Sequence, residues 1–426
     1  MFKPGELSVE IQDNNIKITV PYNTNLDALV PDFEIKGVSI QPASGVPQNF
    51  KSPVVYTVTA ADGSIKKYTV TVIWREAAPI VYFGSNDNYF YAVDAGTGTL
   101  VWKYKGDGSF VYSSATYGIG TVYVGSIDNN VYAFDAFNGD LKWKNKISTT
   151  GIESDAVFAD NTIYVGTNDD ELYALDAANG KVKWKFLTGG NISASPTVSN
   201  GTVYFGSSDG RIYALEAATG QQKWFYQTGA MINQSGPALV NGIIYVGSRD
   251  SYLYAINAST GALIWKYYAN GISLEQSSPT VANRIVYIGG WYDLTFSAKG
   301  SLYAVNATTG QLIWEKLQNT GISSSPFISN GRVYITSDDL KIHVLNASTG
   351  SEIWQKELLA NSASPLVYNG VLYVGGGGNR NFYAFDALTG NEIWKFAIPA
   401  GLSTSSPLIV THAGEPQYSG DSGSLD

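Results

Sequence analysis

Cysteine is absent from the 426 residues, and histidine occurs only as His343 and His412. The chain therefore has no side chains for disulfides, thiolate nucleophiles, iron–sulfur clusters, c-type haem or cysteine-ligated zinc. Two histidines leave almost no residues from which a Ser-His-Asp triad or a multi-histidine metal centre could be built. An enzyme built on this sequence would have to use carboxylates, tyrosines or a bound cofactor.

Long apolar runs and basic clusters are also missing. No run approaches the roughly 18 residues of a membrane-spanning helix, and the first residues do not form a signal-peptide pattern. We therefore expect a protein that is not transmembrane, with either a cytoplasmic location or an export signal outside this sequence. Basic residues number 27 against 36 acidic ones, for a net charge of −9, which argues against nucleic acid as a partner.

Tryptophan marks an internal repeat. Eight of the ten tryptophans recur at intervals of 40 or 41 residues, with one interval of 49. Each follows Gly at −4 and Asp, Glu or Asn at −8, and seven follow Ala at −10, which Val344 replaces in the seventh copy. We expect these indoles to dock between neighbouring repeats: Trp102, Trp143, Trp184, Trp224, Trp265, Trp314, Trp354 and Trp394.

Each repeat has the pattern of four short strands. In the copy ending at Trp224, Asn200-Gly201 and Ser208-Asp209-Gly210 separate alternating runs of β-branched and aromatic residues, and such dipeptides are strong hairpin signals. Four antiparallel strands repeated every 40 to 45 residues are typical of propeller blades. The sequence therefore predicts an all-β, eight-bladed β-propeller over residues 80–410. Residues 405–410 supply the strand missing from blade one and close the ring, and residues 411–426 form a flexible tail.

Residues 1–75 do not follow the repeat. Val54–Ala60 and Ile65–Trp74 alternate around a four-residue turn, and shorter strand patterns precede them. We expect a small Ig-like β-sandwich over residues 1–75, joined to the propeller by a linker at residues 76–79.

The tryptophan motif resembles that of the pyrroloquinoline-quinone (PQQ) repeat family across residues 80–410. This quinoprotein-like family includes PQQ-dependent alcohol and glucose dehydrogenases, and non-catalytic propellers such as the lipoprotein of the outer-membrane barrel assembly machine. The segments 56–64 and 68–72 are similar to Ig-like modules of exported surface lipoproteins of Gram-negative bacteria. The resemblance implies the cell envelope, as periplasm, outer membrane or cell surface, and a lipid anchor on the full-length precursor.

The dehydrogenase class implies a quinone stacked on a tryptophan floor beneath a vicinal disulfide, with calcium held by Glu, Asn and Asp. The disulfide cannot form here, and eight of the ten tryptophans occupy the repeat motif. Trp74 lies in the N-terminal segment, which leaves Trp291 as the one candidate for a floor. We therefore expect neither PQQ nor calcium as a cofactor and assign no catalytic residues. A PQQ- and calcium-dependent oxidoreductase is kept as the alternative.

The central channel offers few charged groups. Three residues before the proline position of each first strand, the sequence has mostly Ser, Thr or amide residues: Tyr112, Glu153, Ser193, Gln234, Gln276, Ser323, Ser362 and Thr404. Glu153 and Asp155 fall on the same strand face, and paired carboxylates could bind calcium or act as acid and base. A solvated rim is the interpretation that we favour for them.

One face of the ring gathers the remaining candidates. The segments entering the first strands and the loops joining the second and third strands emerge on the same side, and an insertion there causes the interval of 49. Aromatic and arginine side chains dominate interface energetics. We predict a partner-binding face with these candidate residues: Trp291, Tyr292, Phe296, Arg249, Asp250, Tyr112, Glu153 and Glu275. The alternative is an insertion that folds back on its blade or covers the channel mouth.

The function predicted from the sequence is a non-catalytic envelope scaffold, expected to be monomeric, that binds an envelope protein or a glycan. Carbohydrate binding or processing, using Glu153, Asp155 and the surface aromatics, is a further alternative. Fold alone does not decide among these functions.

Overall fold

The computed structural model describes residues 8–20, 25–74, 79–291, 300–318, 321–359, 363–399, 401, 403, 405–411 and 415–418. The chain divides into two compact units, Met1–Ala78 and Pro79–Asp426. Tyr292 and Phe296 lie outside the described residues, as do Ser362 and Thr404. All regular elements that the structure describes are strands, which agrees with the predicted all-β class.

The N-terminal unit contains one five-stranded sheet among its described residues, in the order β1-β2-β5-β4-β3. β2 and β5 are parallel, and the other pairs are antiparallel. Residues of one sheet face form its small apolar core together with Leu26, which lies between β2 and β3, and Phe50, which lies between β3 and β4. The strands are β1 (Ser8–Gln12), β2 (Asn15–Val20), β3 (Ser39–Gln41), β4 (Val54–Thr59) and β5 (Ile65–Trp74).

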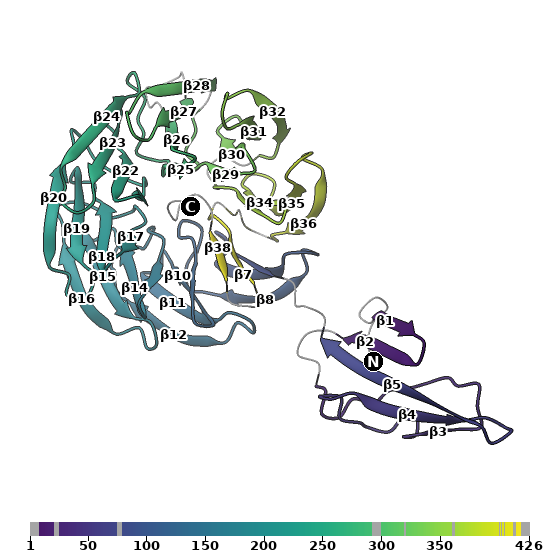
Figure 1. Ribbon diagram of the computed structural model, residues 1–426. Helices are drawn as coiled ribbons and strands as arrows, with labels where there is room; N and C mark the ends of the chain where they lie inside the picture. Colours follow the sequence, from purple (N-terminus) through teal and green to yellow (C-terminus); the bar gives the residue numbers. More distant parts are fainter. Residues whose placement is uncertain are drawn as a thin grey trace. The chain divides into compact units, whose positions relative to one another are not determined.

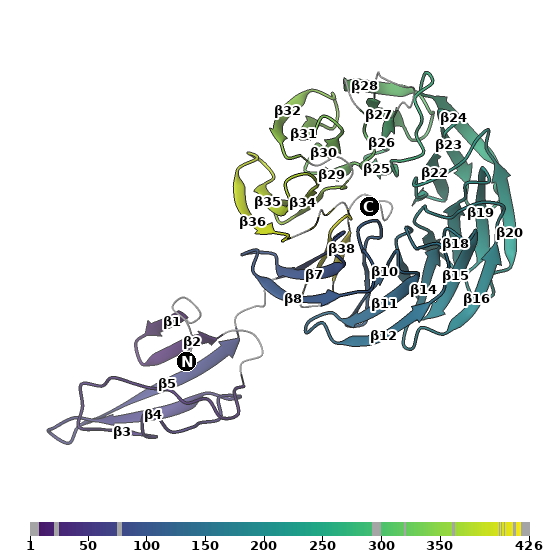
Figure 2. The same cartoon turned by 180° about the vertical axis from the view of Figure 1, so that it is seen from behind.

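The second unit is the propeller, in which eight sheets surround a central axis (Figures 1 and 2). The strands of the first four blades, from the hub outward, are as follows. Blade one has β37 (Leu408–Val410), β6 (Ile80–Gly84), β7 (Tyr89–Asp94) and β8 (Leu100–Lys105); blade two has β9 (Thr116–Gly118), β10 (Thr121–Gly125), β11 (Asn130–Asp135) and β12 (Leu141–Lys146); blade three has β13 (Val157–Ala159), β14 (Thr162–Gly166), β15 (Glu171–Asp176) and β16 (Val182–Leu187); blade four has β17 (Thr197–Ser199), β18 (Thr202–Gly206), β19 (Arg211–Glu216) and β20 (Gln222–Gln227).

The last four blades repeat this order. Blade five has β21 (Ala238–Val240), β22 (Ile243–Gly247), β23 (Tyr252–Asn257) and β24 (Leu263–Tyr268); blade six has β25 (Thr280–Ala282), β26 (Ile285–Trp291), β27 (Gly300–Asn306) and β28 (Leu312–Gln318); blade seven has β29 (Phe327–Ser329), β30 (Arg332–Ser337), β31 (Lys341–Asn346) and β32 (Glu352–Glu357); blade eight has β33 (Leu366–Tyr368), β34 (Val371–Gly376), β35 (Asn381–Asp386) and β36 (Glu392–Ala397). The eight-bladed propeller predicted from the repeat is confirmed.

Blade one combines the two ends of the propeller sequence. β37 pairs antiparallel with β6, matching Leu408 with Tyr82 and Val410 with Ile80. A fifth strand, β38 (Pro416–Tyr418), then pairs with β37 on its hub side, near the centre of the ring in Figure 1. The sequence predicted a flexible tail over 411–426, and residues 416–418 correct that prediction. They are ordered because β37 offers a free edge and the Tyr418 hydroxyl lies 3.2 Å from Oγ1 of Thr116.

Indole packing joins neighbouring blades. The glycine four residues before each tryptophan has a positive φ, and the indole of the preceding blade lies against it. A Cβ on Gly139 would lie only 2.6 Å from the Trp102 ring, so a larger residue would displace the indole. Seven indole Nε1 atoms donate to an alanine carbonyl of the next blade, at 2.9–3.0 Å: those of Trp102, Trp143, Trp184, Trp224, Trp265, Trp314 and Trp394.

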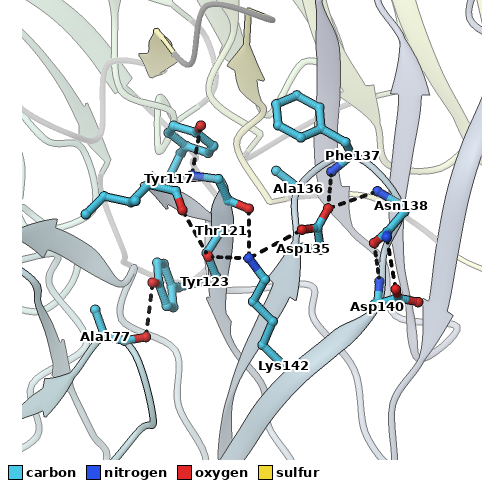
Figure 3. A network of polar contacts seen from close by, with 12 residues as sticks. Tyr117, Thr121, Tyr123, Asp135, Ala136, Phe137, Asn138, Asp140, Lys142 and Ala177 are labelled. Carbon is cyan, nitrogen blue, oxygen red and sulfur yellow. Dashed lines mark hydrogen bonds and ion pairs between the residues drawn. The ribbon is translucent and has the colours of Figure 1, made fainter. Parts of the chain in front are cut away.

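Turn residues hold the outer end of each blade in shape, as Figure 3 shows for blade two. The Asp135 carboxylate accepts hydrogen bonds from the backbone N–H groups of residues 137 and 138, which is the usual role of aspartate in a turn. Lys142 Nζ lies 2.8 Å from Thr121 Oγ1 and 3.4 Å from the Asp135 carboxylate. The Tyr123 hydroxyl donates to the Ala177 carbonyl of blade three at 3.1 Å. The turn thus closes its own blade, and Tyr123 of β10 contacts the next one.

Candidate functional site

The hub of the propeller is lined by polar residues from all eight blades. They enclose a cavity of about 140 Å³. Six of the residues predicted from the proline register line it: Tyr112, Glu153, Ser193, Gln234, Gln276 and Ser323. None of its lining residues is lysine, arginine or histidine, so the described lining carries only neutral and acidic side chains.

A ring of residues next to the proline positions connects the blades around this cavity. We call these eight positions the hub ring: Ser406, Ser114, Asp155, Ser195, Gly236, Ser278, Ser325 and Ser364. The backbone N–H of Ser278 donates to Ser325 Oγ, and that of Ser325 donates to Ser364 Oγ, both at 2.9 Å. Gly236 donates to Ser278 in the same way at 2.9 Å. Side-chain oxygens of the hub ring therefore hold neighbouring blades together.

Asp155 is a member of this ring. One carboxylate oxygen accepts the backbone N–H of Ser114, and the other accepts the Ser195 hydroxyl at 2.7 Å. These bonds give Asp155 a structural role between blades two, three and four. Among the described residues, no group of three or more His, Cys, Asp or Glu side chains is arranged to hold a metal ion.

A second set of serines closes individual blades. Ser277 Oγ accepts the buried backbone N–H of Gly289 at 3.0 Å and donates to the Ser324 carbonyl of the next blade, also at 3.0 Å. The same N–H-to-serine bond recurs in other blades, for example from Gly247 to Ser235 at 3.0 Å. We did not assign a role to these residues from the sequence. The repeated Ser-Ser-Pro at 277–279, 324–326 and 405–407 was the signal that could have identified them.

The segments that enter the first strands and the loops between second and third strands lie on one side of the propeller, which we call the crossover face. Backbone hydrogen bonds join them: Ile127 N–H donates to the Ser109 carbonyl at 3.1 Å, and Arg249 N–H donates to the Met231 carbonyl at 3.0 Å. Tyr112 is 55% exposed on this face and also lines the hub cavity. An exposed aromatic side chain is therefore located at the mouth of the hub.

Three of the predicted partner-binding residues occur together in blades five and six. The Arg249 side chain is about half exposed, and its Nε lies 3.7 Å from the carboxylate of Glu275, which is almost fully buried. Glu275 is therefore placed to orient Arg249 and not to contact a partner directly. The Asp250 carboxylate accepts bonds from Gly229 N–H at 2.7 Å and from the Tyr254 hydroxyl at 2.5 Å, so its oxygens serve the hairpin.

Trp291 lies at the end of β26 and contacts blade seven. Its backbone pairs with Ser273, and its indole lies against Gly321, where an added Cβ would come within 1.8 Å of the ring. Burial raises the pKa of Asp338, and a hydrogen bond from the Trp291 indole opposes this rise. Trp291 is only half buried. Its visible contacts attach the start of the insertion to the neighbouring blade and do not extend the ring into a channel floor.

Repeats of this kind, arranged as eight blades, define a propeller of the PQQ-repeat class. A family model described as outer membrane protein assembly factor BamB matches residues 75–154, 143–298, 232–329 and 298–425, and the chain belongs to this family. A second model, described as SGBP, N-terminal, matches residues 2–72. No curated protein matches the chain.

Solved structures share the propeller fold. BamB from Moraxella catarrhalis is 22% identical, with a TM-score of 0.60 over 70% of this chain and 89% of that one. A europium-containing methanol dehydrogenase is 14% identical, with a TM-score of 0.58 over 72% of this chain and 83% of that one. The quinohemoprotein alcohol dehydrogenase from Comamonas testosteroni is 15% identical, with a TM-score of 0.58 over 71% of this chain and 70% of that one. At these identities the likeness extends to the fold alone.

The hub residues do not fit PQQ. Ligand-binding cavities for molecules of that size usually measure about 300–1,000 Å³, whereas this one measures about 140 Å³. PQQ carries carboxylates, but the lining includes Glu153 and Asp155 and no basic side chain. Tyr112 is the one aromatic residue in that lining, and the sequence has no cysteine for a covering disulfide.

Proposed function

We propose that this protein is a non-catalytic binding propeller of the Gram-negative cell envelope, which holds a partner protein on its crossover face. Family membership supports the envelope location, because the family description names an outer membrane protein assembly factor. Within the described part of the chain, no helix has the length and apolarity needed to span a bilayer. The proposal includes an export signal and a lipid anchor on the full-length precursor.

The exposed Tyr112 beside the hub is the observation that carries this proposal. It is 55% exposed, although the other aromatic residues of the repeat mainly fill the blade junctions. Arg249 adds an exposed guanidinium that Glu275 holds in place. Tyrosine and arginine are enriched among residues that contribute most to protein interfaces. The polar hub groups, by contrast, are largely used to connect blades, which supports a binding role over a catalytic one.

Site-specific photo-crosslinking in cells tests the proposal. A benzophenone amino acid replaces Tyr112 in one variant and Ile119 in the control. Ile119 is 76% exposed in the hairpin between β9 and β10, at the opposite end of the same blade. We expect a discrete crosslinked envelope protein from position 112 and none from position 119.

Alanine variants then measure the contribution of the two side chains. Replacing both Tyr112 and Arg249 should weaken binding of the identified partner at least roughly tenfold, because interface anchors typically contribute about 2 kcal/mol or more. The Tyr112 replacement alone should change the unfolding midpoint little, since this side chain is 55% exposed, whereas the Arg249 replacement should lower the midpoint somewhat because it removes the cation next to the buried Glu275. A crosslink of equal yield at position 119, unchanged partner affinity, or dye-linked alcohol oxidation after addition of PQQ and calcium would contradict the proposed function.

A further inference from the structure

Two sets of polar side chains line the hub of the propeller, and they differ in whether the fold uses them. The first set is the hub ring, whose side-chain oxygens hold neighbouring blades together. The second set lies two residues earlier in each blade and includes the exposed Tyr112. We call its described members, all of which line the cavity of about 140 Å³, the mouth residues: Tyr112, Glu153, Ser193, Gln234, Gln276 and Ser323.

The fold leaves most polar groups of the mouth residues unused. Ser193 donates a hydrogen bond to Asn168 at 3.2 Å. Within the part of the chain that the structure describes, four other side chains of this set take part in no hydrogen bond or ion pair: Glu153, Gln234, Gln276 and Ser323. Asp155 of the hub ring, by contrast, bonds to both neighbouring blades. The mouth residues therefore contribute little to closing the ring, and their oxygens are accessible to a group that enters the cavity.

Glu153 is the charged member of the mouth residues. Other carboxylates of the crossover face have partners within the fold, as Asp128 does in accepting the Tyr132 hydroxyl at 2.6 Å. Glu153 is partly buried, and the cavity lining contains the Asp155 carboxylate but no lysine, arginine or histidine. A partly buried carboxylate without a cation costs free energy. A basic group entering the cavity would therefore gain an ion pair without breaking one.

The size and chemistry of the cavity limit what can enter it. A volume of about 140 Å³ corresponds to about four or five water molecules at roughly 30 Å³ each, which is room for one side chain and not for a loop. A lysine ammonium group has three donors and no acceptor, which suits a lining of carboxylate, amide and hydroxyl oxygens. The ring of Tyr112 lines the same cavity, and aromatic faces attract cations.

We propose that the partner held on the crossover face inserts one lysine side chain into the hub, where the ammonium group pairs with the Glu153 carboxylate. This inference rests on the proposed function and specifies the chemistry of that partner, a protein segment from which a lysine projects. Asp155 keeps its bonds to Ser114 and Ser195, so the blades do not have to separate to admit the lysine.

Charge variants test the insertion, with the partner identified by crosslinking at position 112 as the ligand. Glu153→Gln preserves the shape of the side chain and should weaken binding at least about tenfold, as for other close charge pairs at interfaces. Asp107→Asn is the matched control, because it removes the same charge from a side chain that is 75% exposed and does not line the cavity. It should change the affinity roughly twofold at most, since exposed charges are screened.

A charge swap identifies the inserted residue. Glu153→Lys should abolish binding, and glutamate in place of one particular lysine of the partner should restore the affinity at least about tenfold. The unfolding midpoints of both variants at position 153 should stay near that of the wild type, because this side chain has no partner among the described residues. If no protein is crosslinked at position 112, the proposed function fails and this inference fails with it. If a partner binds but Glu153→Gln weakens binding no more than Asp107→Asn, or if no lysine replacement restores binding to Glu153→Lys, the inference alone is overturned.

Discussion

Trp354 differs from the other repeat tryptophans in the environment of its indole N–H. This group is buried and has no hydrogen-bond partner among the described residues. Trp354 pairs across the strands with Val344, where the other repeats have alanine. Directly opposed residues share a sheet face with Cβ atoms about 5 Å apart, so the two additional methyl groups of Val344 occupy space that the indole has elsewhere. The valine at −10 thus accounts for the hydrogen bond that the Trp354 indole does not make with the described residues of blade eight.

A pair of variants measures what the indole hydrogen bond contributes. Trp224→Phe removes both ring volume and the 3.0 Å bond to the Ala258 carbonyl, whereas Trp354→Phe removes ring volume alone. We expect Trp224→Phe to lower the free energy of unfolding by about 1 kcal/mol more than Trp354→Phe, the usual net value of a hydrogen bond. Chemical denaturation of both variants checks this. Equal losses would show that packing alone, and not the N–H group, makes these tryptophans stabilising.

The short strands β37 and β38 differ in their importance for the ring. β37 is completely buried and joins the two ends of the propeller, while β38 only covers the hub-side edge of β37, whose other edge pairs with β6. A ring without β37 would leave the free edge of β6 facing the hub, and such edges invite non-native pairing.

Two truncations separate these contributions. Ending the chain after residue 411 removes β38 and should lower the midpoint of thermal unfolding by a few degrees, because Tyr418 then no longer contacts Thr116 and Tyr117. Ending it after residue 403 also removes β37 and exposes Val81 and Phe83, so we expect loss of cooperative unfolding and aggregation. Calorimetry with size-exclusion chromatography distinguishes them. If the shorter chain unfolds as cooperatively as the longer one, β37 does not hold the ring together.

Strand positions in the propeller were predictable because their signals are local. Asn-Gly at 200–201 specifies a hairpin turn, and both residues adopt the positive φ angles that this turn requires. The fold class followed from repetition of such signals at a fixed interval. β38 gave no comparable signal, since Pro416–Tyr418 is too short to alternate. It becomes a strand because of β37, which a local pattern does not reveal.

The candidate site was less predictable because its contacts join distant residues. Glu153 and Asp155 both line the hub cavity, but they precede β13 and do not share a strand face as predicted. The Ser114 and Ser195 contacts that engage Asp155 come from blades about 40 residues away in each direction. The sequence made Asp250 a candidate for partner binding. In several other blades, however, the aspartate at the equivalent position also accepts a hydrogen bond from the tyrosine hydroxyl four residues later. Tyr56 alternates like any core residue, and only the structure shows that its hydroxyl has no hydrogen-bond partner among the described residues.

At the scale of the whole molecule, tyrosines of the second strands connect the blades all around the ring. Their hydroxyls donate to alanine carbonyls of the next blade at 2.7–3.2 Å: Tyr82, Tyr123, Tyr164, Tyr245, Tyr287, Tyr334 and Tyr373. Burial raises the pKa of each of these phenols, that of Tyr287 to about 12. Ionisation would remove a donor and place a charge in an apolar junction, so seven of the eight junctions share one vulnerability.

This arrangement predicts a steep loss of stability at alkaline pH. A folded-state pKa above the ordinary value of 10.0 means that the contribution of the group is complete below pH 10 and is lost as the pH rises towards the folded-state pKa. Each such tyrosine can lower the free energy of unfolding by up to about 1.4 kcal/mol per pH unit in that interval. Denaturant titrations between pH 8 and pH 11.5 measure how steeply the free energy of unfolding falls with pH. Tyr287→Phe should reduce this slope by the amount that corresponds to about one proton.

Absorbance at 295 nm, followed together with circular dichroism, should show these phenols ionising only as the sheets unfold. Reversible ionisation of all tyrosines near pH 10 with an unchanged spectrum of the folded sheets would show instead that the junctions tolerate phenolate, and the hydroxyl–carbonyl bonds would then contribute little to holding the ring closed.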